Sequence, residues 1–182
     1  MRLFTGLDLP SEVVGNLGDL LRRLRPTARI HWSPPENLHI TTKFIGEWPE
    51  GRLGELKTAL AAPAARPPIA VRIHNLGFFP PGRAPRIFWC GIDAPGLAEL
   101  AGATDDATAA LGVARETRPF SPHLTLGRIA DRADVAALRQ AMAGLASTEF
   151  GRFEARSYFL YLSQLRPSGS VYTKLAEFPL SP

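Results

Sequence analysis

The sequence predicts an α+β protein whose strands pair mainly in antiparallel fashion. Strand-like runs come in pairs along the chain, and amphipathic stretches with helical spacing interrupt them. Several of these pairs are joined by proline- and glycine-rich turns that are too short for a crossover. Antiparallel sheets are therefore favoured over parallel βαβ units, which are the alternative. The length fits one domain, residues 1–182, or two small lobes that share one body.

The first half of the chain is expected to begin with a strand over Arg2–Leu9. Ser11 then stands at the position of an N-cap, and leucines at helical spacing follow it as far as Pro26. The further elements predicted in this half are strands over Ile30–Ser33 and Leu38–Gly46, a helix over about residues 50–62, and strands over Ile69–Phe79 and Arg86–Asp93.

The second half repeats this rhythm. A helix opened by Pro95 and Gly96 precedes a strand over His123–Ile129. Asp131 is a candidate cap for a third long helix, whose apolar stripe would consist of Val135, Leu138, Met142 and Leu145. Two long strands are expected to close the chain, over Phe150–Leu165 and Ser170–Leu180, with the turn Pro167-Ser168-Gly169 between them.

Composition is that of an ordinary globular protein. Hydrophobic residues make up 45% and charged residues 21%, which excludes a disordered or collagen-like chain. No run of about 18 apolar residues is present, so neither a transmembrane helix nor a membrane partner is expected. The N-terminal residues do not have the pattern of a signal peptide, and Cys90, the single cysteine, cannot form an internal disulfide. We therefore expect a cytoplasmic protein and, since nothing in the sequence requires a dimer, a monomer.

The net charge of +4 rests on 18 arginines and 3 lysines. Guanidinium groups suit phosphate because they offer a planar fork of donors. The basic residues are spread along the chain without a run, so this feature favours a nucleic-acid partner only weakly.

Two of the four histidines stand in near-identical settings. The segment around His39 has the sequence P-P-E-N-L-H-I-T-T-K-F, and the segment around His123 has the sequence F-S-P-H-L-T-L-G-R. Each is a proline-led entry into an apolar strand with the pattern H-x-T. The histidines are 84 residues apart, near half the chain, which is typical of one motif in each lobe of a duplicated fold.

Side-chain alternation places His39 with Thr41 on one face of a strand, and His123 with Thr125. Two such strands facing each other would bring two imidazoles and two hydroxyls around one cavity. This set suits phosphoryl transfer, in which an acid and a base act on opposite sides of phosphorus. With an unperturbed pKa of about 6.5, one imidazole can be protonated and the other neutral near pH 7. Threonine hydroxyls can donate to phosphoryl oxygens, and the scheme needs no metal.

The segments H-I-T-T-K-F and H-L-T-L-G-R resemble the paired H-x-T-x motifs of the two-histidine (2H) phosphoesterases. Within that superfamily the chain is most similar to the RNA 2′,3′-cyclic phosphodiesterases, also called 2′-5′ RNA ligases. The resemblance runs nearly end to end, through R-L-F-T-G-L-D-L-P, W-S-P-P-E-N-L-H-I-T, R-I-F-W-C-G-I-D, R-P-F-S-P-H-L-T-L-G-R and Y-L-S-Q-L-R-P-S-G-S-V-Y-T-K-L. One departure is Thr42, where the family usually has an apolar residue. Alternation turns Thr42 away from the site, so we expect it to affect packing.

The resemblance implies two pseudo-symmetric lobes, each a mainly antiparallel sheet with helices packed outside, and an active-site cleft between the sheets. It implies metal-independent and cofactor-independent attack of water on a terminal RNA 2′,3′-cyclic phosphate, which opens to a 2′-phosphate. His39 would be the general acid that protonates the leaving 3′ oxygen and His123 the general base that activates water. Thr41 and Thr125 would hold the phosphate. The implied partner is RNA with such an end, tRNA halves included, and 2′-5′ ligation is a further implied activity.

Arg128 is a candidate substrate-binding residue, because the family often carries a phosphate-contacting arginine at this distance after the second histidine. Strict alternation places Arg128 on the face opposite His123. It reaches the site only if the strand bulges or ends near Gly127, which a glycine there permits. A solvated surface arginine is the alternative.

Other hypotheses stay open. A non-catalytic RNA-binding protein could use the same basic cleft, and a phosphodiesterase of the same superfamily could act on small cyclic nucleotides or on 2′-5′ linkages. A metal site of His31 and His74 with the two motif histidines lacks the close spacing of metal ligands. Candidates for stacking on bases are Trp32, Trp89, Phe4 and Tyr172, although aromatic residues in strands mostly belong to the core.

Overall fold

The computed structural model describes residues 1–167 and 169–182. In chain order its strands are β1 (Arg2–Leu7), β2 (His31–Trp32), β3 (Ile40–Glu47), β4 (Ile69–Phe79), β5 (Ile87–Asp93), β6 (His123–Arg128), β7 (Glu149–Ala155), β8 (Ser157–Arg166) and β9 (Gly169–Pro179). The α-helices are α1 (Ser11–Leu24), α2 (Leu53–Ala61), α3 (Leu97–Ala109) and α4 (Ala136–Ala143). Short 3-10 helices are η1 (Arg25–Thr27), η2 (Pro35–Asn37), η3 (Glu50–Arg52) and η4 (Ala62–Ala64).

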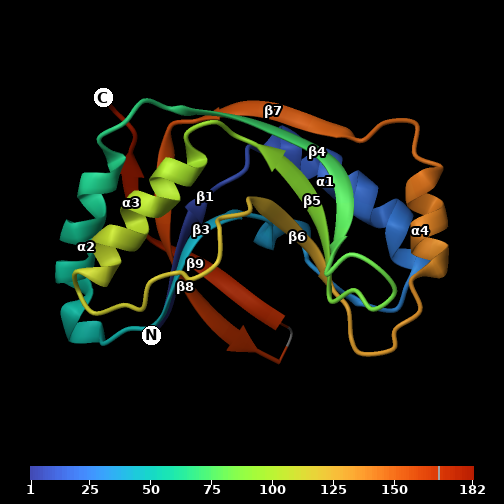
Figure 1. The fold of residues 1–182 in the computed structure, drawn as a ribbon, viewed down its shortest axis with the longest axis horizontal. Helices are drawn as coiled ribbons and strands as arrows, with labels where there is room; N and C mark the ends of the chain where they lie inside the picture. The colour runs from blue at the N-terminus through green and yellow to red at the C-terminus, as the bar shows by residue number, and fades with distance from the viewer. Residues whose placement is uncertain (168) are drawn as a thin grey trace.

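The strands form two sheets, and the predicted α+β class is confirmed (Figure 1). The four-stranded sheet has the order β3-β1-β8-β9, and the five-stranded sheet has the order β2-β6-β5-β4-β7. Every pairing between these strands is antiparallel, so the alternative of parallel βαβ units is wrong.

The two sheets are built from equivalent strands. The motif strand β3 pairs with β1, and the motif strand β6 pairs with β5, and the sequences around β1 and β5 are similar to each other. The sequence is R-L-F-T-G-L-D around β1 and R-I-F-W-C-G-I-D around β5. β8 pairs with the far side of β1 and β4 with the far side of β5, and β9 and β7 lie outside them. The lobes are thus pseudo-symmetric, as the resemblance implied.

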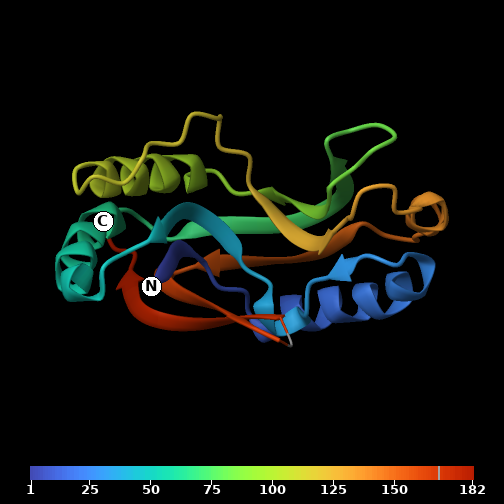
Figure 2. The ribbon, with the colours of Figure 1, turned by 90° about the horizontal axis from the view of Figure 1, so that it is seen from below.

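The helix that follows each of these central strands packs against the other sheet. α1 follows β1 but contacts β7, and α3 follows β5 but contacts β3. In Figure 1, α2 and α3 lie at one end of the molecule beside the four-stranded sheet, whereas α1 and α4 lie at the other end. Figure 2 shows the same division in a second view. The two halves of the chain are therefore interlocked.

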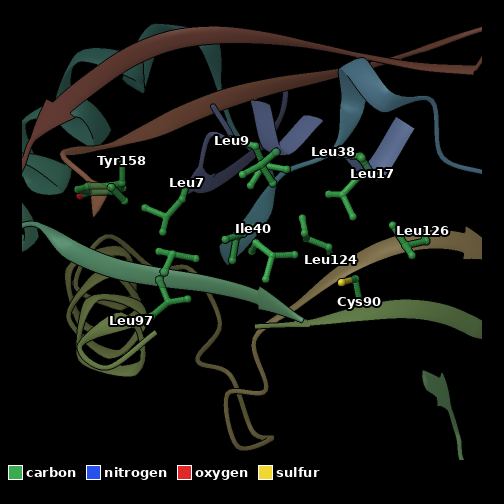
Figure 3. Packing of buried hydrophobic residues seen from close by; sticks show 14 of the residues in the cluster. Leu7, Leu9, Leu17, Leu38, Ile40, Cys90, Leu97, Leu124, Leu126 and Tyr158 are labelled. Atoms are coloured by element: carbon green, nitrogen blue, oxygen red, sulfur yellow. The ribbon is translucent and has the colours of Figure 1, made fainter. Parts of the chain in front are cut away.

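One continuous apolar core joins the two sheets. Leu7 and Ile40 enter it from the four-stranded sheet, and Cys90, Leu124 and Leu126 enter it from the five-stranded sheet, all fully buried (Figure 3). Full burial of a leucine or isoleucine side chain stabilises a fold by about 1.5–3 kcal/mol. Because side chains alternate along strands, the faces turned away from this core carry the polar residues of the H-x-T motifs.

A buried lysine ties β3 to the segment that leads toward β6. The side chain of Lys43 is 1% exposed, and its ammonium lies 2.6 Å from Oδ1 of Asp105 on α3. The same ammonium donates to the carbonyl oxygen of Ala114 at 2.7 Å and lies 3.4 Å from Oε1 of Glu116. A lysine is almost never fully buried unless it is paired, so this cluster is a specific link between the lobes.

The predicted strand over Phe150–Leu165 is wrong, because the chain changes sheets inside it. β7 ends at Ala155 in the five-stranded sheet, and β8 begins at Ser157 in the four-stranded sheet. Only Arg156 separates them, and its exposed guanidinium pairs with Glu154. The buried positions shift by one residue across the crossing, from Ala155 to Tyr158, but no glycine or proline marks this break in the sequence.

The helix predicted after Asp131 begins later and is shorter. Its N-cap is Val135, and Oδ1 of Asp134 accepts the backbone N–H of Ala136 at 2.9 Å. α4 then ends at Ala143, before Leu145 of the predicted apolar stripe. The positive φ of 62° at Arg132 makes a helical start at Asp131 impossible.

No helix in residues 1–167 or 169–182 combines the length and apolar character needed to cross a bilayer. Of the predicted turn Pro167-Ser168-Gly169, Ser168 lies outside the described residues.

Replacing Lys43 by methionine is expected to destabilise the fold by about 3 kcal/mol, because it leaves a largely buried carboxylate and a carbonyl without their shared donor. Urea unfolding measures this loss. The matched control is Arg22→Met, whose ion pair with Asp19 is exposed on both sides and should contribute less than about 1 kcal/mol. Equal losses in the two variants would contradict the role assigned to Lys43.

Candidate active site

His39 and His123 are each held by the same local hydrogen bond. Nδ1 of His39 lies 2.7 Å from the carbonyl oxygen of Asn37, and Nδ1 of His123 lies 2.8 Å from that of Ser121. A carbonyl oxygen only accepts, so Nδ1 carries a proton and donates in both rings. Nε2 of each ring is therefore the atom left to exchange a proton with a substrate.

Alternation holds through the threonines of both motifs. Ile40 and Leu124 lie in the core, and Thr41 and Thr125, which follow them, are half-buried on the opposite face. The face of each sheet that carries the threonine also carries the histidine two residues before it. We call these two surfaces the motif faces of the four-stranded and five-stranded sheets.

β3 carries a β-bulge directly after Thr41. Thr41 and Lys43 pair with consecutive residues of β1, so Thr42 is an extra residue in the strand. Thr42 turns into the core as predicted, and its Oγ1 lies 2.8 Å from Oγ1 of Thr5. Because a bulge shifts the alternation by one residue, Phe44 emerges on the motif face.

β6 carries the equivalent bulge after Thr125. Thr125 and Gly127 pair with consecutive residues of β5, which makes Leu126 the extra residue. Arg128 then pairs with Ile87, and this register returns it to the motif face. The bulge on which the position of Arg128 depended is therefore present.

Phe44 is a candidate site residue that the sequence argument missed. Phe44 and Arg128 each stand five residues after the motif histidine, and strict alternation turns both away from the site. Phe44 is 58% exposed, and its ring centroid lies 6.2 Å from that of Phe4, which lies 4.7 Å from His39. The equal spacing in sequence, five residues from His39 to Phe44 and from His123 to Arg128, is the signal that could have identified Phe44.

Aromatic rings enclose His39. Tyr172 meets the imidazole edge-on at 5.0 Å between centroids, and Tyr161 stacks on Phe4 at 4.9 Å. Phe4 is one of the predicted candidates for stacking on bases. It is only 3% exposed, so it is a buried ring beneath the histidine and not a platform for a base. The cluster fixes the orientation of the His39 ring on three sides.

The pKa of His39 lies below its ordinary value. Burial is the largest cause, while the hydrogen bond with Asn37 and the charge of Asp8 act in the opposite direction. The positive charge of Arg128 lowers the pKa further. Arg128 belongs to the five-stranded sheet and His39 to the four-stranded sheet, so this interaction joins the two motif faces at one site.

The surroundings of His123 are also aromatic. Phe79 meets its ring edge-on at 5.5 Å between centroids, and Trp89 packs on Phe79 at 5.1 Å. Gly77 lies under Trp89, where an added Cβ would come within 2.2 Å of the indole. Only glycine therefore lets this indole lie close to β4.

His39 lines a cavity of about 430 Å³. Its walls come from η2, from β8 and β9, and from Asp8 after β1. We call it the η2–β9 cavity.

The remaining residues that the sequence analysis considered are the stacking candidate Trp32, the single cysteine and the histidines of the metal-site hypothesis. The indole N–H of Trp32 donates to the carbonyl oxygen of Ala28 at 3.1 Å, and burial raises the pKa of the Cys90 thiol to about 12. Within residues 1–167 and 169–182 no group of three or more His, Cys, Asp or Glu side chains is placed to hold a metal ion. His31 lies on β2 opposite Arg128, and His74 lies on β4 opposite Gly91, which in turn pairs with His123.

Comparison with known proteins agrees with this arrangement. Residues 7–89 and 92–172 match the family described as LigT like Phosphoesterase. An RNA 2′,3′-cyclic phosphodiesterase of Methanocaldococcus jannaschii is 32% identical over 178 residues, which cover 98% of this chain and 100% of that protein. A relative of the same name in Thermus thermophilus is 32% identical over 99% of this chain and 90% of its own.

Solved structures show the same fold. The structure of TT0787 of Thermus thermophilus superposes with a TM-score of 0.83 at 30% identity, covering 99% of this chain and 98% of that chain. The apo structure of LigT from E. coli superposes with a TM-score of 0.78 at 26% identity, covering 100% and 98%. This chain belongs to the LigT-like phosphoesterase family, within the two-histidine phosphoesterases. It is therefore an enzyme of the phosphodiesterase class.

The lowered pKa of His39 predicts a pH-dependent stability. The unfolded chain binds a proton to this histidine more readily than the fold does, so the contribution of neutral His39 is complete above about pH 6.5, the unfolded value, and is lost as the pH falls. Acidification from pH 7.5 to 5 should therefore destabilise the wild type more than His39→Gln, as measured by urea unfolding. His31→Gln, at an exposed histidine outside the motifs, is the matched control. The same pH dependence in wild type and His39→Gln would contradict this account.

Proposed function

We propose that this chain hydrolyses the 2′,3′-cyclic phosphate at the end of an RNA strand to a 2′-phosphate, without a metal ion or cofactor. The observation that carries the proposal is the pair of equivalent histidines, each with Nδ1 bound to a carbonyl and Nε2 left for chemistry. Family membership and the names of the relatives in Methanocaldococcus jannaschii and Thermus thermophilus support it.

In the proposed reaction, Nε2 of His123 takes a proton from water while the water oxygen bonds to phosphorus. The bond between phosphorus and the 3′ oxygen breaks in line with this attack, and Nε2 of His39 gives its proton to the leaving oxygen. The products are a 2′-phosphate and a 3′-hydroxyl, and the two histidines have exchanged their protonation states. Ligation to a 2′-5′ bond, with tRNA halves among the substrates, would use a 5′-hydroxyl in place of water.

The remaining motif residues act on the phosphate. Thr41 and Thr125 donate to its non-bridging oxygens, where negative charge increases in the transition state. The guanidinium of Arg128, which the bulge in β6 returns to the motif face, binds the same group. These donors come from both sheets, so the phosphate is held between the two histidines.

The proposed acid must be protonated, although burial lowers the pKa of His39 in the free protein. A bound phosphodiester brings a negative charge against the ring, which raises this pKa. The carboxylate of Asp8 acts in the same direction. Substrate binding therefore favours the protonated form that the reaction needs.

A short RNA ending in a 2′,3′-cyclic phosphate, incubated in EDTA and followed by phosphorus NMR, tests the proposal. The wild type should produce a 2′-phosphate. His39→Ala and His123→Ala should each lower the rate by about 10²–10⁴-fold, the usual contribution of a general acid or base. A wild type that binds the RNA without turnover would instead be an RNA-binding protein. Turnover of a cyclic mononucleotide but not of the RNA would identify a small-nucleotide phosphodiesterase.

Phe44 is the place on the four-stranded motif face where the base of the reacting nucleotide would stack. An exposed aromatic ring is a common platform for nucleic-acid bases, and Phe44 lies beyond Phe4 from His39. The base is attached to the same ribose whose 3′ oxygen meets His39. A platform one ring away from the histidine is therefore within reach of it.

Phe44→Ala should raise KM for the cyclic-phosphate RNA by about tenfold, because base stacking on one aromatic ring contributes about 1–3 kcal/mol. The change in kcat should be smaller, because the acid and the base remain in place. Phe153→Ala, which removes a half-buried ring from the outer strand β7, is the matched control and should leave KM unchanged. Equal effects of the two substitutions on KM would rule out stacking on Phe44.

A further inference from the structure

His39 forms one end of the η2–β9 cavity, and the rest of the cavity has no part in the reaction proposed above. The cavity volume of about 430 Å³ falls in the range of small-molecule sites, about 300–1,000 Å³. One wall is η2 with Glu36 and Asn37, and the opposite wall is β9 with Lys174. The side-chain amide of Asn37 donates to the carbonyl oxygen of Ser170 at 2.6 Å, so the two walls are joined. The cavity is thus part of the fold before any ligand binds.

Tyr161 lines this cavity with a polar atom that the protein does not use. The residue is 5% exposed, and its buried hydroxyl has no hydrogen-bond partner. A buried polar group without a partner costs about 1–3 kcal/mol, so the hydroxyl is unlike an ordinary core atom. Burial raises the pKa of Tyr161, and the nearby charge of Asp8 raises it further. The hydroxyl therefore stays protonated and is available as a donor.

The charges around the cavity indicate what kind of ligand fits. Asp8 forms an ion pair with Lys174, and Glu36 adds an exposed carboxylate, so the lining away from His39 carries one more negative than positive charge. A phosphate group would meet net repulsion in this part of the cavity. Carboxylates instead accept hydrogen bonds from ribose hydroxyls and from the N–H groups of bases, and hydroxyl contacts are how proteins distinguish RNA from DNA.

The geometry of ribose gives the direction of the RNA strand across the site. C2′ and C3′ hold the cyclic phosphate, and the base leaves the ring at C1′ while the 5′ chain leaves at C4′, on the other side. With the base on Phe44, the 5′ chain leaves His39 in the opposite direction. Across the four-stranded sheet, Phe44 pairs with Phe4 on one side, and Tyr161 pairs with Phe4 on the other. Tyr161 and its neighbour Lys174 line the η2–β9 cavity, so the cavity and Phe44 lie on opposite sides of Phe4.

We propose that the η2–β9 cavity binds the nucleoside on the 5′ side of the nucleotide that carries the cyclic phosphate, with the Tyr161 hydroxyl as a hydrogen-bond donor to it. This inference rests on the proposed function and goes beyond it, because it makes an RNA of at least two nucleotides the preferred substrate. A cyclic mononucleotide would leave the cavity empty.

Calorimetric titration with two product analogues tests the inference: adenosine 2′-phosphate, and the dinucleotide ApA with a terminal 2′-phosphate. The wild type should bind the dinucleotide about tenfold more tightly than the mononucleotide. Tyr161→Phe should weaken dinucleotide binding by about fivefold, the value of one hydrogen bond of about 1 kcal/mol, and so reduce this preference.

Tyr158→Phe is the matched control, because the buried hydroxyl of Tyr158 donates to the carbonyl oxygen of Leu60 far from the site. It should lower stability while the preference for the dinucleotide stays at the wild-type value. Equal affinity of the wild type for both ligands would overturn the proposal. Equal weakening of both ligands by Tyr161→Phe would also overturn it, because the cavity would then hold the reacting nucleoside. Binding needs no turnover, so failure of this proposal is distinguishable from failure of the hydrolysis assay.

Discussion

The single extra residue after each motif threonine is the constraint on which the site depends. A regular strand shows one face only every second residue, so it could offer the histidine and threonine but not the residue five places after the histidine. The bulges at Thr42 and Leu126 break this period at the same point in both sheets. They return an aromatic ring, Phe44, to one motif face and a guanidinium, Arg128, to the other. Pseudo-symmetric backbones thus carry chemically different groups at matching positions.

The same bulge explains why a charged side chain lies in the interior. In β3, the extra residue Thr42 and the next residue, Lys43, both turn inward, because the alternation is interrupted at the bulge. It resumes after Lys43, so Phe44 turns outward. An inward lysine at this point needs a partner, and Asp105 on α3 supplies it together with the carbonyl oxygen of Ala114. Because α3 comes from the other half of the chain, the residue next to the bulge also connects the halves. Site geometry and the link between lobes therefore have one local cause.

Much of this architecture could be predicted from the sequence because its signals are local. The strand over Ile69–Phe79 has the predicted bounds, and the H-x-T pairs lie on the predicted faces. The first helix lies where it was predicted, although its N-cap is Pro10 and not Ser11. The crossing at Arg156 was missed, because strand pairing depends on partners distant in sequence, and no glycine or proline marks the shift in alternation there. Phe44 was missed for the same kind of reason, since a bulge exists only relative to a neighbouring strand. Cavity residues such as Tyr161 have no sequence signal, because only tertiary packing shows that its hydroxyl has no partner.

The exchange of elements between the halves bears on how such a fold arises. The first half of the chain contributes β1 and β3 to the four-stranded sheet, whereas its α1 and β4 belong to the side of the five-stranded sheet. In the second half, α3 and β8 belong to the side of the four-stranded sheet. Two identical half-length chains that swapped a helix and a strand would form this same arrangement as a homodimer, with one motif histidine per chain. Fusion of the two genes would then let the copies diverge, one toward an acid and one toward a base. The described residues of both halves share one apolar core, so the difference between Phe44 and Arg128 at matching positions depends on the covalent joining of the halves.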